Sequence, residues 1–72
     1  MLLTFELSNG NEIDIHGDAS GLRRLAETLQ RVLDSGEHEH LMTPSWGGTE
    51  LSEEKQSDQS ALVHKVTIHL WS

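Results

Sequence analysis

Apolar and polar residues alternate in two runs near the start of the chain. The apolar positions of these runs are Leu3, Phe5 and Leu7, then Ile13 and Ile15. A period of two predicts two half-buried β-strands. Asn9-Gly10 lies between the runs, and this dipeptide favours the two positive-φ residues of a type I′ turn. The N-terminal segment is therefore predicted to form a β-hairpin.

The next segment has the spacing of a helix. Its apolar residues recur three or four positions apart, at Leu22, Leu25, Ala26, Leu29, Val32 and Leu33. This spacing predicts one buried stripe along an amphipathic helix. Asp18 or Ser20 can accept hydrogen bonds from free amides at the helix start, and Gly36 suits the left-handed residue that follows a helix end.

Two further strands are predicted in the second half of the chain. Residues 37–43 form a short, weakly patterned run that stops before Pro44. From residue 45 to about residue 60 the chain is polar, and a loop of this length is usually functional or mobile. Residues 62–71 alternate again, and the predicted inner face carries Leu62, His64, Val66, Ile68 and Leu70. At the edge of the core, His64 is expected to be hydrogen-bonded.

These elements predict a single α+β domain over residues 1–72, in the order ββαββ. One helix would pack on one face of a mainly antiparallel, four-stranded sheet, which makes two layers. A chain of 72 residues is too short for a second domain or for an enclosed substrate cavity of ~300 Å³. The other sheet face would be open, and it would carry Thr4, Glu6, Glu12, Asp14, His16, Lys65, Thr67, His69 and Trp71.

Charge narrows the range of partners. The chain has 12 acidic and 5 basic residues, hence a net charge of −7 with neutral histidines. This charge repels phosphate backbones and anionic lipids, so neither a nucleic-acid nor a membrane partner is expected. A basic protein partner is favoured, although solubility alone would also account for the charge.

Cysteine content and hydropathy bear on the compartment and on membrane association. The chain has no cysteine, which excludes disulfides and thiolate zinc sites and fits a reducing compartment. No apolar run approaches a membrane span, and the N-terminus lacks the pattern of a signal peptide. A cytoplasmic location is therefore expected.

Candidate catalytic and metal-binding groups are few. His38 and His40 would share a strand face and could chelate zinc with further ligands, although ordinary exposed histidines explain the pair equally well. The serines lack a nucleophile-elbow motif, and no Gly-Lys-Ser/Thr follows Gly47-Gly48. We therefore expect no cofactor, no metal and no enzymatic activity.

Trp46-Gly47-Gly48 is the most unusual local feature of the sequence. Tryptophan is enriched in interface hot spots, and the glycines allow a tight turn that projects the ring. In the alternative interpretation, Trp46 folds back as a lid over the core edge. Together with the acidic residues, this turn gives the predicted partner-binding set, which is Glu6, Glu12, Asp14, Trp46, Gly47, Gly48, Glu50 and Trp71.

Residues 15–26, Ile-His-Gly-Asp-Ala-Ser-Gly-Leu-Arg-Arg-Leu-Ala, resemble the G-L-x-x-L-A helix of the bacterial immunity protein 32 family. His38-Glu39-His40-Leu41, Trp46-Gly47-Gly48, Leu51 and residues 66–70 strengthen the resemblance, which covers nearly the whole chain. That family is associated with polymorphic toxin systems, in which a small immunity protein protects the producing cell from a toxin encoded beside it. The resemblance implies a cytoplasmic, non-enzymatic binder of a cognate toxin domain, and it identifies neither the toxin nor its contact residues.

Two alternatives to toxin binding remain open. The free strand edges of a thin sheet invite pairing between copies, so a homo-oligomeric structural or regulatory module, such as a homodimer, is one. The other is a weak metal-binding domain built on His38 and His40. Self-association is compatible with an immunity role.

Overall fold

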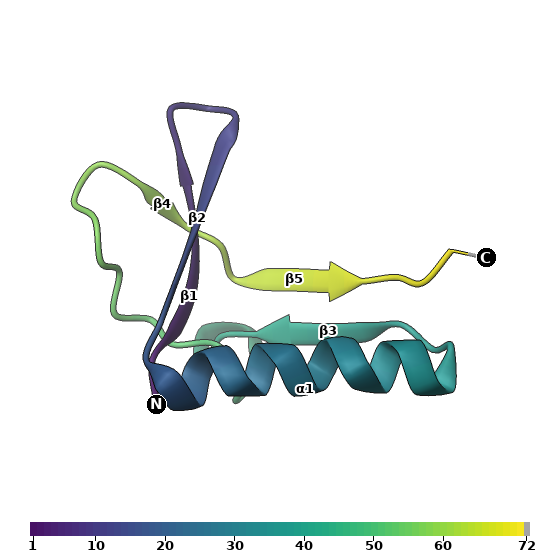
Figure 1. Ribbon diagram of the computed structural model, residues 1–72. Helices are drawn as coiled ribbons and strands as arrows, with labels where there is room; N and C mark the ends of the chain where they lie inside the picture. The colour runs from purple at the N-terminus through teal and green to yellow at the C-terminus, as the bar shows by residue number, and fades with distance from the viewer. Residues whose placement is uncertain (72) are drawn as a thin grey trace.

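Two antiparallel sheets and one helix make up the fold. In the computed structural model, which describes residues 1–71, the elements are β1 (Leu3–Ser8), β2 (Glu12–Gly17), α1 (Ala19–Ser35), β3 (Glu39–Met42), the 3₁₀ helix η1 (Pro44–Trp46), β4 (Ala61–Leu62) and β5 (Lys65–Ile68). One sheet has the strand order β2-β1-β4, and the other pairs β3 with β5 (Figure 1). The α+β class is confirmed, whereas the prediction of one four-stranded sheet is wrong.

The N-terminal hairpin forms as predicted. β1 and β2 pair in antiparallel register from Leu3 opposite Gly17 to Ser8 opposite Glu12. Asn9 and Gly10 have φ angles of 52° and 78° at the turn. These are the two positive angles that a type I′ turn requires.

Helix α1 begins and ends at the predicted residues. The side chain of Asp18 accepts a hydrogen bond from the Gly21 amide at 2.8 Å. Gly36 adopts φ 77°, and its amide donates to the carbonyl of Val32. A side chain on Gly21 would overlap the Leu2 carbonyl oxygen, so the residue at this position must be glycine for the helix to lie so close to the start of β1.

The predicted C-terminal strand is broken because the chain passes from one sheet to the other. The Val63 amide donates to the Phe5 carbonyl of β1, whereas the His64 carbonyl accepts from the Thr43 amide just after β3. This change of partner interrupts the alternation of inner and outer residues. As a result, Val63 packs against the core, and Leu70 is exposed.

The hydrophobic core is small. Its fully packed members are Leu3, Phe5, Leu41 and Leu51, and the partly buried residues around them are Leu25, Val63, Val66 and Ile68. From α1, Gly21, Thr28 and Val32 are buried. These three residues and Leu25 lie on one face of the helix by their spacing.

The predicted helical stripe is therefore only partly buried, which corrects the sequence-based expectation. Leu22, Leu29 and Leu33 remain 47%, 45% and 61% exposed. The helix is rotated about its axis so that Thr28 and Val32, and not these leucines, face the core.

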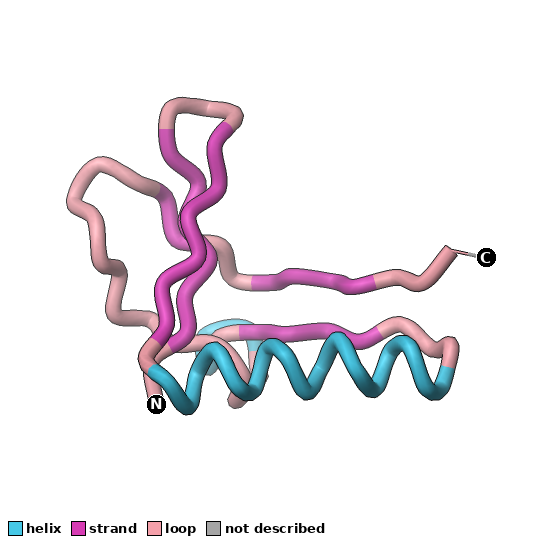
Figure 2. Tube along the Cα trace, viewed as in Figure 1, coloured by secondary structure: helices cyan, strands magenta, loops and turns pink. Residues whose placement is uncertain are grey.

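Residues 51–60, which we call the strap, form the second part of the connection from η1 to β4 and lie beside β1 (Figure 2). The Ser52 amide donates to the Leu3 carbonyl at 2.8 Å, and the Leu3 amide donates to the Ser52 hydroxyl at 3.1 Å. The strap then folds over the side chain of Glu6. It covers Thr4 and Glu6, so the sheet face predicted to be open is closed along β1.

Candidate partner-binding surface

Glu6, the first predicted contact residue, is fully buried. Its Oε1 accepts hydrogen bonds from the Ser60 hydroxyl at 2.6 Å and the Ser57 amide at 3.1 Å. Its Oε2 accepts from the Thr4 hydroxyl at 2.7 Å and the Gln56 amide at 2.8 Å. The carboxylate therefore fastens the strap to β1 and is not available on the surface, which corrects the expectation that it faces solvent.

The four donors determine the charge state of Glu6. Burial by itself raises the pKa of this carboxyl group, but the hydrogen bonds from Ser60, Gln56, Thr4 and Ser57 lower it to about 2. Hydrogen bonds to the ionised form stabilise that form. Glu6 is thus a carboxylate at neutral pH, and its negative charge is stabilised by hydrogen bonds within the molecule.

Glu12 and Asp14 do lie on the surface. Both are exposed on β2, and Asp14 stands opposite Glu6 in the strand register. The Asn9 amide group donates to Glu12 at 2.8 Å, and the Ser8 hydroxyl donates to Asp14 at 3.2 Å. Because the strap folds over Glu6, its exposed residues Glu54 and Asp58 lie near this face. We call the residues Glu12, Asp14, Glu54 and Asp58 the acidic surface.

The Trp46 turn has a defined shape. Gly47 ends η1 with φ 88°, and its amide donates to the Pro44 carbonyl. A side chain on Gly48 would overlap the backbone of Met42, so this position must also be glycine. The ring of Trp46 stacks on His64 with centroids 5.7 Å apart and an interplanar angle of 2°, and the residue remains 57% exposed. Trp46 thus covers His64 on one side and can still contact a partner.

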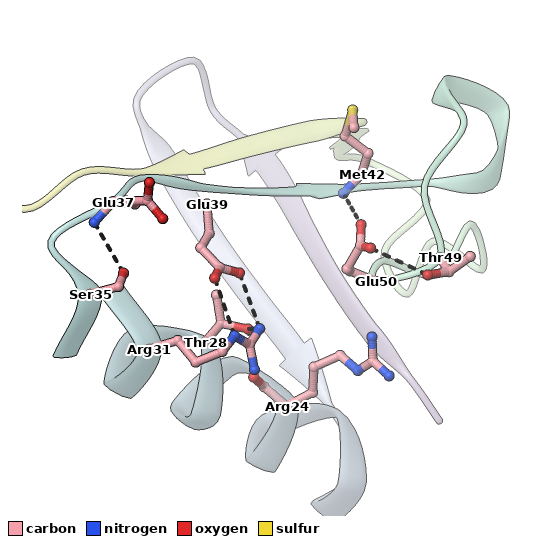
Figure 3. A network of polar contacts seen from close by, with 9 residues as sticks. All are labelled: Arg24, Thr28, Arg31, Ser35, Glu37, Glu39, Met42, Thr49 and Glu50. Atoms are coloured by element: carbon pink, nitrogen blue, oxygen red, sulfur yellow. Dashed lines mark hydrogen bonds and ion pairs between the residues drawn. The ribbon is translucent and has the colours of Figure 1, made fainter. Parts of the chain in front are cut away.

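Two carboxylates hold this turn in place. Glu50 accepts hydrogen bonds from the Met42 amide at 3.0 Å and the Thr49 hydroxyl at 3.3 Å (Figure 3). Glu53 accepts from the Ser45 amide at 2.7 Å, close to the N-terminus of η1. Hydrogen bonding to Met42 lowers the pKa of Glu50, and hydrogen bonding to Ser45 lowers that of Glu53. Glu50, predicted as a contact residue, supports the turn from within.

Arg31 connects the helix to β3. Its guanidinium group contacts both carboxylate oxygens of Glu39, at 3.1 and 3.2 Å, and donates to the Thr28 hydroxyl (Figure 3). The ion pair lowers the pKa of Glu39 and raises that of Arg31. One of the few basic side chains is therefore engaged within the molecule.

Three histidines form a cluster where β3 begins and β5 ends: His38 precedes β3, His40 lies in β3, and His69 follows β5. The ring of His38 lies 4.9 Å from that of His40 and 5.5 Å from that of His69, measured between centroids. His40 is also within hydrogen-bonding distance of the Thr67 hydroxyl, at 3.0 Å. Residues 1–71 contain no group of three or more side chains arranged to hold a metal ion. His64 is hydrogen-bonded to Thr43 at 2.7 Å, as predicted.

The predicted contact residues lie in three separate places. Glu12 and Asp14 are on the hairpin, Trp46 to Glu50 form the turn after β3, and Trp71 lies beyond β5, which runs away from the hairpin (Figure 1). Trp71 is 90% exposed. Across the described residues, no pocket is enclosed. No helix in this part of the chain is long and apolar enough to cross a membrane.

Sequence reasoning missed a second surface. Five apolar side chains that the pattern assigns to the core are between 45% and 62% exposed, and we call them the apolar row: Ile13, Ile15, Leu22, Leu29 and Leu33. The alternation correctly places the two isoleucines on one face of their strand, and the helical spacing correctly places the three leucines on one face of the helix. One signal could have indicated their exposure: the predicted core contains more apolar side chains than so short a chain can bury.

Comparisons with known proteins place the chain in a family. The family model described as Immunity protein 32 matches residues 12–66, which is more than half of the chain. The match spans β2, α1, β3 and the strap and ends within β5. Neither a curated protein nor a solved structure gives a significant match.

Proposed function

The chain belongs to the immunity protein 32 family, and we propose from this that it neutralises a cognate bacterial toxin by binding it. It acts in the cytoplasm of the producing cell, as a stoichiometric binder without catalysis. Family membership carries the proposal, and the surface chemistry suggests how the partner is recognised. The partner is a basic toxin domain, because the chain carries a net charge of −7.

The acidic surface is the proposed docking site for basic side chains of the toxin. Glu12 and Asp14 are exposed and point away from the core face of the hairpin. Facing charges of opposite sign raise the association rate and exclude wrong partners. Glu6 is not part of the contact, because it is buried beneath the strap.

Trp46 and Trp71 are the proposed aromatic contacts. The ring of Trp46 is already fixed by stacking on His64. Little conformational freedom is therefore lost when a partner covers the other face of this ring. Gly47 and Gly48 give the turn its shape, and Glu50 fastens it to β3. Trp46→Ala should therefore raise the dissociation rate by about tenfold or more, with little change in association.

The test uses the protein product of the reading frame adjacent to this gene. Purified chain should bind that product, and co-expression should rescue growth of cells that make it. The variant Glu12→Lys/Asp14→Lys should associate at least ~10-fold more slowly at low salt. Glu27→Lys/Asp34→Lys is the matched control, because it makes the same change in net charge at exposed positions on α1.

The two double variants distinguish the effect of the acidic surface on the association rate from the effect of net charge. If both slow association equally, only overall charge matters and the acidic surface is not the docking site. If the unmodified chain neither binds the adjacent product nor rescues growth, the proposal of a neighbouring toxin is wrong.

A further inference from the structure

The apolar row runs from β2 onto α1. A side chain built on Gly17 would lie 2.9 Å from Leu22 Cδ2, so Leu22 packs against the face of β2 that also carries Ile13 and Ile15. From Leu22, the row continues along α1 through Leu29 and Leu33, which share a helix face by their spacing. Surfaces of this kind on soluble proteins mark interaction sites.

The molecule as a whole exposes more surface than a compact monomer of its size. A folded monomer of 8.1 kDa is expected to expose about 4,500 Å², whereas this chain exposes 4845 Å². Its radius of gyration is 12.3 Å, against about 11.2 Å expected for a compact domain of this length. The excess area is a little under half of the ~800 Å² that each partner buries in an interface of standard size.

We propose that a second copy of the chain covers the apolar row, forming a twofold symmetric dimer. Residues 1–71 bury five apolar side chains in the core, so covering the row would add substantially to the apolar surface that the fold removes from water. A second copy is present wherever the chain is made, whereas a toxin is present only at intervals. In a twofold symmetric dimer the apolar row of one copy packs against the same row of the other. This interface leaves no free copy of the row, so the assembly stops at two chains.

The dimer and the proposed toxin site do not compete. Successive side chains of a strand point to opposite faces, so Ile13 and Ile15 lie on one face of β2, and Glu12 and Asp14 lie on the other. Covering the row leaves the acidic surface free. This inference rests on packing alone and does not depend on the identity of any toxin.

The experiment measures the mass of the purified chain in solution. Light scattering and sedimentation equilibrium should give twice the 8.1 kDa of one chain. Leu29→Glu should raise the dimer dissociation constant at least ~100-fold, because it places an unpaired charge in an apolar interface. Leu70→Glu is the matched control, an exposed leucine outside the row, 43% accessible, and it should change that constant by less than ~3-fold.

A second measurement keeps the test decisive if Leu29→Glu does not fold. The melting temperature of the unmodified chain should rise with protein concentration, because dimerisation stabilises the folded state by mass action. Ile13→Lys, at the 62% exposed end of the row, should remove that rise. A monomer with a concentration-independent melting temperature overturns the proposal, and so does a dimer that Leu70→Glu dissociates and Leu29→Glu does not.

Discussion

At the scale of single residues, Glu6 shows why a charge on an alternating strand cannot be assigned to solvent by pattern alone. Its position on the polar side of β1 was predicted correctly, but its burial depends on Gln56, Ser57 and Ser60, which are fifty or more positions away in sequence. No local spacing encodes such a contact. The four donors make the carboxylate part of the fold, whereas Asp14, its neighbour across the strands, stays on the surface.

Glu6→Gln should destabilise the chain by about 2–3 kcal/mol. The amide nitrogen of glutamine would replace one acceptor oxygen, and each oxygen of Glu6 faces one backbone amide. That backbone donor would lose its hydrogen bond to the buried side chain of residue 6. Urea unfolding measures the change, and Glu12→Gln, at an exposed position on the same hairpin, should cost less than ~0.5 kcal/mol. Equal losses in both variants would contradict the structural role of Glu6.

Stability should fall in two separate ranges as the pH is lowered. His40 is exposed, but partial desolvation lowers its pKa, and Lys65, His38 and His69 lower it further. Its contribution to stability is therefore present above pH 6.5 and declines below that pH. The pKa of Glu6 is lowered from 4.5 to about 2. Its contribution is present above pH 4.5 and is lost as the pH falls toward 2. Urea midpoints measured against pH should show a smaller upper step in His40→Gln and a smaller lower step in Glu6→Gln. Part of the lower step remains in Glu6→Gln, because Glu39, Glu50 and Glu53 also have lowered pKa values.

At the scale of elements, the sequence predicted correctly those features that depend on a few neighbouring residues, namely one turn and the two helix ends. The Asn9-Gly10 turn, the Asp18 cap and the Gly36 end all form where their sequence signals place them. The division into two sheets was not predictable, because it depends on Val63 bonding to Phe5 of β1 and His64 bonding to Thr43, just after β3. The rotation of α1 was not predictable either, since a broad apolar stripe fits several rotations and packing selects one.

Gly21→Ala should destabilise the chain by about 3 kcal/mol, although alanine favours helices. A methyl group at this position meets the Leu2 carbonyl oxygen, so α1 must move away from the start of β1. The control is Gly36→Ala, where nothing lies within 4 Å and the strain comes only from φ 77°, a cost of about 1 kcal/mol. Thermal unfolding of the two variants distinguishes them, and similar losses would show that the close approach is unimportant.

At the scale of the whole molecule, β2 divides two kinds of surface. One face carries exposed carboxylates beside the strap, and the opposite face begins the apolar row that continues along α1. Charge gives speed and selectivity to an encounter, whereas apolar area gives persistence. We propose on this basis that the transient partner binds the acidic surface and that the permanent partner covers the apolar row.

The stoichiometry of the toxin complex tests that assignment. If the two faces of β2 act independently, a dimer should bind one toxin domain on each copy, and light scattering should give the mass of a 2:2 complex. Leu29→Glu should halve that mass to a 1:1 complex and leave the association rate unchanged, because Glu12 and Asp14 remain exposed. The control Leu70→Glu should keep the 2:2 mass. A 1:1 complex formed by the unmodified dimeric chain would mean that the toxin displaces the second copy from the apolar row. Toxin binding and dimerisation would then compete, and the two faces of β2 would not act independently.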